Sequence, residues 1–149
     1  MQNRTQLYEQ DFYAWTEEQV KLLKNQQWGL LDTDNLIEEL ESLGKQQRRE
    51  LENRLAILIG HLLKWEYQPH LRCNSWRSTI REQRRKIQRH LAENPSLKSY
   101  LHQAFTIAYE DGRDLAIQET NLPDRTFPDT NPYPIDDVLC FEFLPSEQH

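Results

Sequence analysis

The feature that most constrains this chain is a leucine-rich periodicity between Leu36 and Trp65. Large apolar residues recur there at intervals of three, four or eight: Leu36, Leu40, Leu43, Leu51, Leu55, Leu58, Leu62 and Trp65. This spacing is typical of one face of an α-helix, which the capping residue Asp32 and the later Pro69 limit to about residues 33–67. At 1.5 Å per residue such a helix is roughly 50 Å long. It must either kink or project beyond its neighbours, and we expect a kink or break near Gly44.

Three further segments have helical spacing, at about residues 8–26, 75–93 and 96–120. The first should turn Phe12, Trp15, Leu22 and Leu23 inward. Pro95 ends the segment at 75–93, and Pro123 ends the segment at 96–120. The stretch LAILIGHLLKW within residues 33–67 is apolar on nearly all sides, so this helix should be the central one.

The remaining residues, 121–149, form a proline-rich tail without a sustained period. It nevertheless contains seven large apolar side chains: Phe127, Tyr133, Ile135, Val138, Leu139, Phe141 and Phe143. A disordered tail would not carry so many, so we expect it to wrap the bundle with a short turn near residues 134–140. The predicted fold is therefore all-α, a bundle of four main helices with an ordered C-terminal tail, in one domain over residues 1–149.

Composition narrows the cellular setting. No apolar run approaches the roughly 18 residues that span a bilayer, and the first residues lack the apolar core of a secretory signal. Cys73 and Cys140 have neither the spacing of a metal site nor the density of a disulfide framework. We therefore expect a cytoplasmic protein without a membrane partner.

The corner between the second and third helices, HLLKWEYQPHLRCNSWR, concentrates polar and aromatic residues. Its candidates are His61, Lys64, Trp65, Trp76 and Arg77, to which the helical projection adds Arg84 and Asp111. One interpretation is a structural clasp, in which Asp111 pairs with Arg84 or Arg77 and a cation lies on an indole face. The other is a pocket in which Asp111 acts as an acid coupled to His61.

Catalytic and metal-binding patterns are missing from the sequence. It contains no His-Glu-x-x-His or Glu-x-x-His motif, no Gly-x-Ser-x-Gly elbow and no glycine-rich phosphate loop. We predict no metal and no cofactor, we assign no catalytic residue, and the pattern favours a non-enzymatic role.

The third helix is basic within an acidic chain. Residues 72–90 carry seven basic side chains and one acidic one, whereas the formal net charge of the chain is −6. Arg77, Arg81, Arg85 and Arg89 are candidate nucleic-acid contacts. The same residues could instead form a solvated face or complement acidic neighbours, and the overall acidity opposes nonspecific DNA binding.

Several blocks match a known family in their order along the chain. They are YEQDFYAW, LDTDNLIEELESLGKQQRREL, HLLKWEYQP, SWRSTIREQRRKI, NPSLK, AYEDGRDLAIQETNLP and FPDTNPYPIDDVL. Over about residues 8–139 the chain resembles domain of unknown function 29, a bacterial family common in cyanobacteria. The resemblance implies an all-helical bacterial domain and brings no established activity. Gly112 departs from the alanine-like residue expected there and should loosen the fourth helix slightly.

Taken together, these features predict a bacterial cytoplasmic helical module for interaction or scaffolding. Its partner would be another protein or a second copy of the chain. One alternative is a nucleic-acid-binding protein that uses the basic third helix. The other is an enzyme or small-ligand binder centred on His61, Asp111 and Arg84, with Lys64 beside them.

Overall fold

The computed structural model describes residues 4–146, and every regular element in that range is a helix. The predicted all-α class is confirmed, with four substantial helices. The chain divides into two compact units, and the division falls between Gln46 and Gln47, inside helix α3 (Thr33–Tyr67). A single domain over the whole chain stays a prediction, and its residues 1–3 and 147–149 lie outside the described range.

The N-terminal unit consists of α1 (Arg4–Gln10), α2 (Phe12–Lys24), a 3-10 turn at Trp28–Leu30 and the start of α3. One helix over residues 8–26 was predicted, but Asp11 divides it. The backbone of Asp11 is not helical, and its carboxylate accepts a hydrogen bond from the Ala14 amide at 3.0 Å. Asp11 is therefore the N-cap of α2. The apolar periodicity continues across Asp11, so it did not indicate that a helix ends there.

A buried polar joint fixes the start of α3 within this unit. The indole Nε1 of Trp15 donates to Asp32 Oδ2 at 3.0 Å, and the Asp32 amide donates to Gln19 Oε1 at 2.9 Å. All three side chains are buried. The Tyr8 hydroxyl of α1 also donates to Glu39 of α3, and this hydrogen bond raises the pKa of Tyr8 to about 12. From this joint α3 continues through Gly44, so the break expected there does not occur.

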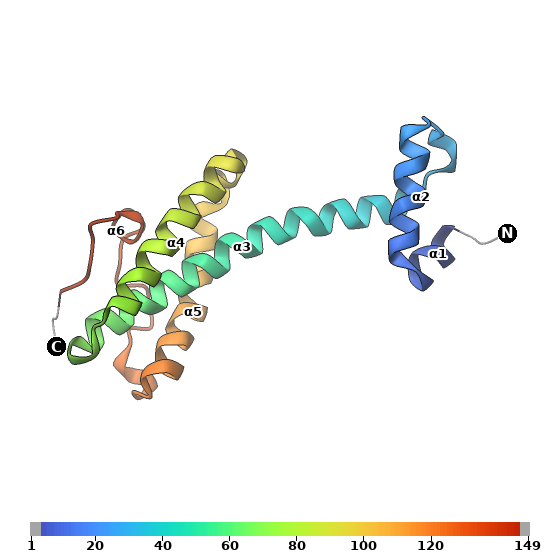
Figure 1. Ribbon diagram of the computed structural model, residues 1–149. Coiled ribbons are helices and arrows are strands. Elements are labelled where there is room, and N and C mark those ends of the chain that lie inside the picture. The colour runs from blue at the N-terminus through green and yellow to red at the C-terminus, as the bar shows by residue number, and fades with distance from the viewer. Residues whose placement is uncertain (1–3, 147–149) are drawn as a thin grey trace. The chain divides into compact units, whose positions relative to one another are not determined.

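In the C-terminal unit the second part of α3 is the central helix, as predicted. α4 (Asn74–Glu93) and α5 (Leu101–Thr120) lie alongside it (Figure 1). The core residues that these three helices supply are Leu51, Leu55, Ala56, Leu58, Ile59, Leu62, Leu63, Trp65, Ile80, Ile87, Ala104, Ala108, Tyr109 and Ala116. Two 3-10 turns connect the helices, at Pro69–Leu71 and Pro95–Tyr100. The predicted fourth helix therefore begins at Leu101 rather than at residue 96.

Gly112 lies at a close approach of α5 to α3. A Cβ atom there would lie 2.8 Å from the backbone oxygen of Ala56 and 3.1 Å from Ile59 Cβ. Alanine, which the resemblance led us to expect, does not fit without moving the helices apart. Gly112 thus permits the close packing of the core.

The C-terminal tail is ordered against this unit, as predicted. It contains a 3-10 turn at Asp124–Thr126 and the short helix α6 (Ile135–Leu139). Phe127, Tyr133 and Val138 are buried in the common core. The Tyr133 hydroxyl donates to the buried carboxylate of Glu66 at 2.9 Å. The tail therefore completes the core and satisfies a buried charge.

Candidate functional site

Lys64 connects three helices at the polar corner. Its side chain is only 5% exposed, although it carries a charge. Nζ lies 4.7 Å from the ring centroid of Trp76 on α4 and donates to Glu119 Oε1 on α5 at 2.7 Å. A buried cation of this kind requires a partner, and here an indole face and a carboxylate provide it.

Trp65 receives two cations at the same corner. The guanidinium carbons of Arg72 and Arg77 lie 5.0 and 5.3 Å from its ring centroid. Arg72 Nε also donates to the backbone oxygen of Trp65 at 2.8 Å. The structure thus places Arg77 on Trp65 and Lys64 on Trp76, where one cation on an indole face was expected. Sequence reasoning did not assign this role to Arg72, although Arg72 lies in the same corner stretch, seven residues after Trp65.

His61 is half-buried on α3, close to Lys64. Its Nδ1 lies 2.9 Å from the Ile57 backbone oxygen, and because a carbonyl only accepts, Nδ1 carries the hydrogen. Burial lowers the pKa of His61 below its usual value, and the hydrogen bond to Ile57 opposes this effect in part. Burial therefore favours the neutral ring, and the hydrogen bond to Ile57 fixes its orientation on its own helix, an arrangement that fits a structural histidine.

The predicted pairing of Asp111 with Arg84 is wrong. Asp111 is exposed on α5, and within residues 4–146 no hydrogen bond or ion pair joins it to Arg84, Arg77 or His61. Arg84 is 3% exposed and donates to three tail carbonyls. The distances are 2.7 Å from Nε to Val138 O, 3.3 Å from Nη1 to Phe141 O and 2.8 Å from Nη2 to Phe143 O. The partners of Arg84 thus lie in the tail.

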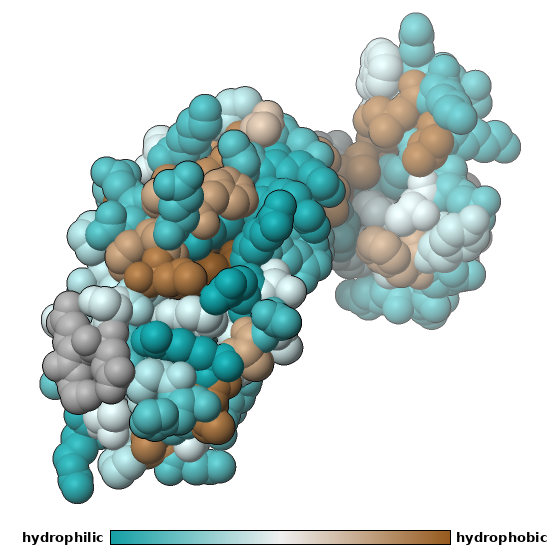
Figure 2. Space-filling view, turned by 60° about the vertical axis from the view of Figure 1, so that its left-hand side comes forward, coloured by the Kyte–Doolittle hydropathy of each residue, from teal (hydrophilic) through white to brown (hydrophobic). Residues whose placement is uncertain are grey.

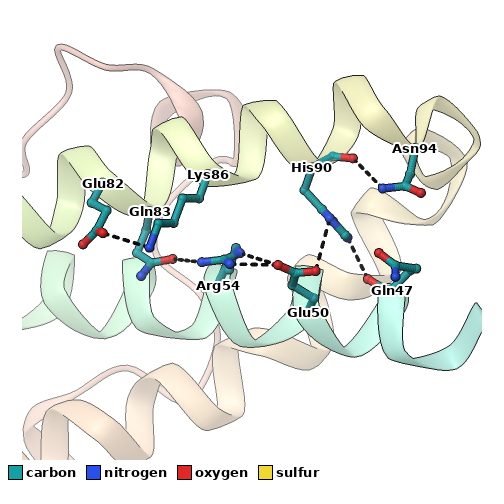
Figure 3. A network of polar contacts seen from close by, with 8 residues as sticks. All are labelled: Gln47, Glu50, Arg54, Glu82, Gln83, Lys86, His90 and Asn94. Atoms are coloured by element: carbon teal, nitrogen blue, oxygen red, sulfur yellow. Dashed lines mark hydrogen bonds and ion pairs between the residues drawn. The ribbon is translucent and has the colours of Figure 1, made fainter. Parts of the chain in front are cut away.

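A polar network joins α3 to α4 farther along the two helices (Figure 3). Arg54 donates to Glu50 Oε1 at 2.8 Å, and its Nη1 lies 3.4 Å from Gln83 Oε1. His90, which is buried, lies between Glu50 Oε2 at 3.4 Å and the Gln47 backbone oxygen at 2.9 Å. The sequence analysis did not select this network. Its signal was present, because Gln83 and His90 stand at helical spacing from the buried Ile87.

This network fixes the rotation of α4, so that a row of arginines faces outward. Arg77, Arg81, Arg85 and Arg89 are all exposed and follow one another at intervals of four residues. In the described part of the chain none of them forms an ion pair. The candidate nucleic-acid contacts therefore share one solvent-facing side of α4.

The N-terminal unit exposes most of its large apolar side chains, contrary to prediction. Phe12 and Leu23 were expected to face inward but are 49% and 42% exposed. Leu40 and Leu43, expected on the core side of α3, are 65% and 54% exposed. Of the twelve exposed large apolar residues in the described range, nine lie between residues 12 and 43. Figure 2 shows apolar patches on the surface of this unit.

Residues 4–146 contain no cluster of three histidine, cysteine or acidic side chains suited to a metal ion. Within the same range no helix is both long and apolar enough to cross a membrane. The predicted absence of a metal and of a cofactor stays a prediction, which elemental analysis of the purified protein can test.

Comparison with known proteins places the chain among its relatives. Residues 7–144 match the family described as "Domain of unknown function DUF29". The chain belongs to this family. This confirms the resemblance seen in the sequence, whereas neither curated proteins nor solved structures yield a match. DUF29 membership assigns no activity, so the surfaces of the two units are the remaining guide to function.

Proposed function

We propose that this DUF29 chain is a protein-interaction module that binds through the start of α3. The binding surface is the leucine face, which we define as Ile37, Leu40 and Leu43. The observation that carries the proposal is their exposure: each of these large apolar side chains is about half exposed or more. Contiguous apolar surface rimmed by polar residues is typical of binding sites. A partner helix that packs its own apolar stripe against the leucine face would remove these three side chains from water.

Charge indicates the chemistry of the partner. Glu38 and Glu41 flank the leucine face, and residues 1–44 carry nine acidic and three basic side chains. Two leucine faces would bring like charges together, which disfavours a second copy as the occupant. Nucleic acid and anionic membranes would be repelled as well. The surface therefore suits an amphipathic helix whose apolar stripe is flanked by lysine or arginine.

A designed peptide tests this pairing. We would use a labelled helical peptide with leucines at helical spacing and lysines elsewhere, and measure binding by fluorescence anisotropy. A peptide with glutamate in place of lysine should bind more weakly, and so should a scrambled peptide of the same composition. Binding should also weaken as salt is added, because the flanking charges are exposed.

Two variants locate the binding surface. The double change Leu40→Ala and Leu43→Ala should raise the dissociation constant at least about tenfold. Leu71→Ala removes another exposed leucine, outside the N-terminal unit, and should leave binding unchanged. Equal binding by both variants, or by the scrambled peptide, would contradict the proposal. A dimer in sedimentation that the double change dissociates would make a second copy the occupant instead.

We also propose a bacterial cytoplasmic location for this module. Its support is that Cys73 and Cys140 are both free and exposed, as suits a reducing compartment. A fusion of the chain to a fluorescent protein, fractionated from bacterial cells, would test the location. Recovery in the periplasm would contradict it.

The arginine row on α4 supports nucleic-acid binding as a second candidate function. Four exposed arginines at intervals of four residues can follow a phosphate backbone. Retention of single-stranded and double-stranded DNA and RNA should then fall with salt, and Arg85→Gln with Arg89→Gln should weaken it. Retention that is absent at low salt, or unaffected by the two changes, would remove this candidate.

A further inference from the structure

A groove runs between α4 and the end of the tail in the C-terminal unit. Its volume is about 420 Å³, which lies in the range of small-ligand sites. Arg77, Ile80, Arg81 and Arg84 of α4 line one side of the groove, and Phe141 and Leu144 of the tail line the other. The lining thus combines cations with an apolar surface.

Arg84 at this groove is a buried cation that has no counter-ion among residues 4–146. Its guanidinium has five N–H groups, and three of them are used by the carbonyls of Val138, Phe141 and Phe143. In the described residues no carboxylate pairs with it. Carbonyl dipoles satisfy hydrogen bonds but leave the positive charge uncompensated. A buried charge in this state is costly, and an anion in the groove would relieve the cost.

Two exposed arginines extend the cationic wall. Arg77 lies over Trp65, and Arg81 stands one helical turn farther along α4 without an ion pair in residues 4–146. The opposite wall offers the exposed Phe141 and the half-buried Leu144. Hydrated inorganic ions gain nothing from such a wall, whereas a ring or a branched chain does.

We propose that this groove binds a small amphiphilic anion, a carboxylate carried on an aromatic or branched apolar body. The carboxylate is held by Arg81 and Arg84, and the body lies against Phe141 and Leu144. Arginine suits a carboxylate because its planar fork can donate two parallel hydrogen bonds. Glu142 also lines the groove and carries the opposite charge to the arginines. Because three arginines outweigh this one glutamate, the groove keeps a net positive charge and favours an anion.

Three probes separate recognition of the carboxylate from recognition of the apolar body. Phenylacetate carries both the carboxylate and the ring, acetate carries only the charge, and 2-phenylethanol carries only the ring. Binding would be followed by nuclear magnetic resonance titration of the full chain. Phenylacetate should bind at least about tenfold more tightly than either fragment, because charge-assisted hydrogen bonds and apolar burial add. Equal binding of acetate would reduce the groove to a plain anion site and overturn the proposal.

Variants on one helix provide matched controls. Arg81→Ala should weaken phenylacetate binding about tenfold, whereas Arg89→Ala, which removes an exposed arginine of the same row outside the groove, should leave it unchanged. Glu142→Gln should tighten binding severalfold, because it removes the opposing carboxylate. A gain of binding cannot come from unfolding. No saturable binding of phenylacetate, equal effects of Arg81→Ala and Arg89→Ala, or no gain with Glu142→Gln would each overturn the proposal.

Discussion

Replacing Gly112 by alanine should destabilise the C-terminal unit, although alanine is the better helix former. The added Cβ would lie 2.8 Å from the Ala56 backbone oxygen, whereas ordinary van der Waals contact begins near 3.4 Å. The obstacle is the backbone of α3, which cannot rotate aside as the end of a long side chain can. α3 and α5 must therefore separate by several tenths of an ångström, and their common core loses contacts.

The magnitude follows from two opposing effects. Overpacking a well-filled core costs about 1–3 kcal/mol, and alanine in place of glycine returns about 1 kcal/mol of helix propensity. Gly44→Ala is the matched control, because Gly44 is also helical but has nothing within 4 Å of the added Cβ. That variant should stabilise by up to about 1 kcal/mol. The difference between the two variants, about 1–3 kcal/mol, isolates the packing cost.

Both variants would be measured by urea unfolding with far-UV circular dichroism and by thermal melts. For a chain of this size 1 kcal/mol corresponds to about 2–4 °C in Tm. Because Gly44 and Gly112 lie in different units, amide hydrogen exchange should be followed separately in each. If Gly112→Ala were as stabilising as Gly44→Ala, the close approach of α3 and α5 would not constrain the core.

Three further outcomes test burial and ionisation. Phe127→Ala should lower the free energy of unfolding by about 3–5 kcal/mol in urea, since this tail residue is buried, and a loss below about 1 kcal/mol would contradict its role in the core. Burial raises the pKa of Tyr109 to about 12 and also raises that of Tyr133, so both hydroxyls lose their protons more readily in the unfolded chain. The free energy of unfolding should therefore fall as pH rises from 10 to 12. Tyr133→Phe should reduce this alkaline loss in thermal melts, and an unchanged pH dependence would argue against it. Burial lowers the pKa of His61, so its resonance titration should have a midpoint below 6.5, and stability should fall as pH drops below that value. A midpoint at or above 6.5 would contradict the effect of burial on this ring.

The helices of the C-terminal unit could be predicted because their signals are local. Apolar spacing located α3, and Pro69 and Pro95 marked the ends of α3 and α4 to within two residues. Interruptions that depend on one side chain were harder to see. Asp11 divides the first predicted helix by capping α2, yet it does not disturb the apolar period on either side.

The polar site was predicted only where its partners are close in sequence. The cations over Trp65 and Trp76 come from the same corner, where Arg77 or Lys64 was expected on an indole face, and Arg72 was not. The helical projection placed Asp111 inward, whereas it is exposed, and the buried residues of α5 are Ala104, Ala108, Tyr109, Gly112 and Ala116. The carbonyl partners of Arg84 lie more than fifty residues away in the tail, where no period indicates them.

The exposed leucines of α3 show where periodicity itself stops being informative. Leu40 and Leu43 recur at the same helical spacing as Leu55 and Leu58, but the first pair is exposed and the second is fully buried. A helix that is covered by its own chain and one that is covered by a partner have the same apolar pattern. Flanking charge distinguishes the two cases better: Glu38 and Glu41 border the exposed leucines, and a basic partner would neutralise them. The basic helix of this chain already buries its apolar face in the C-terminal core through Ile80 and Ile87, which supports the proposal that a basic partner helix covers the leucine face.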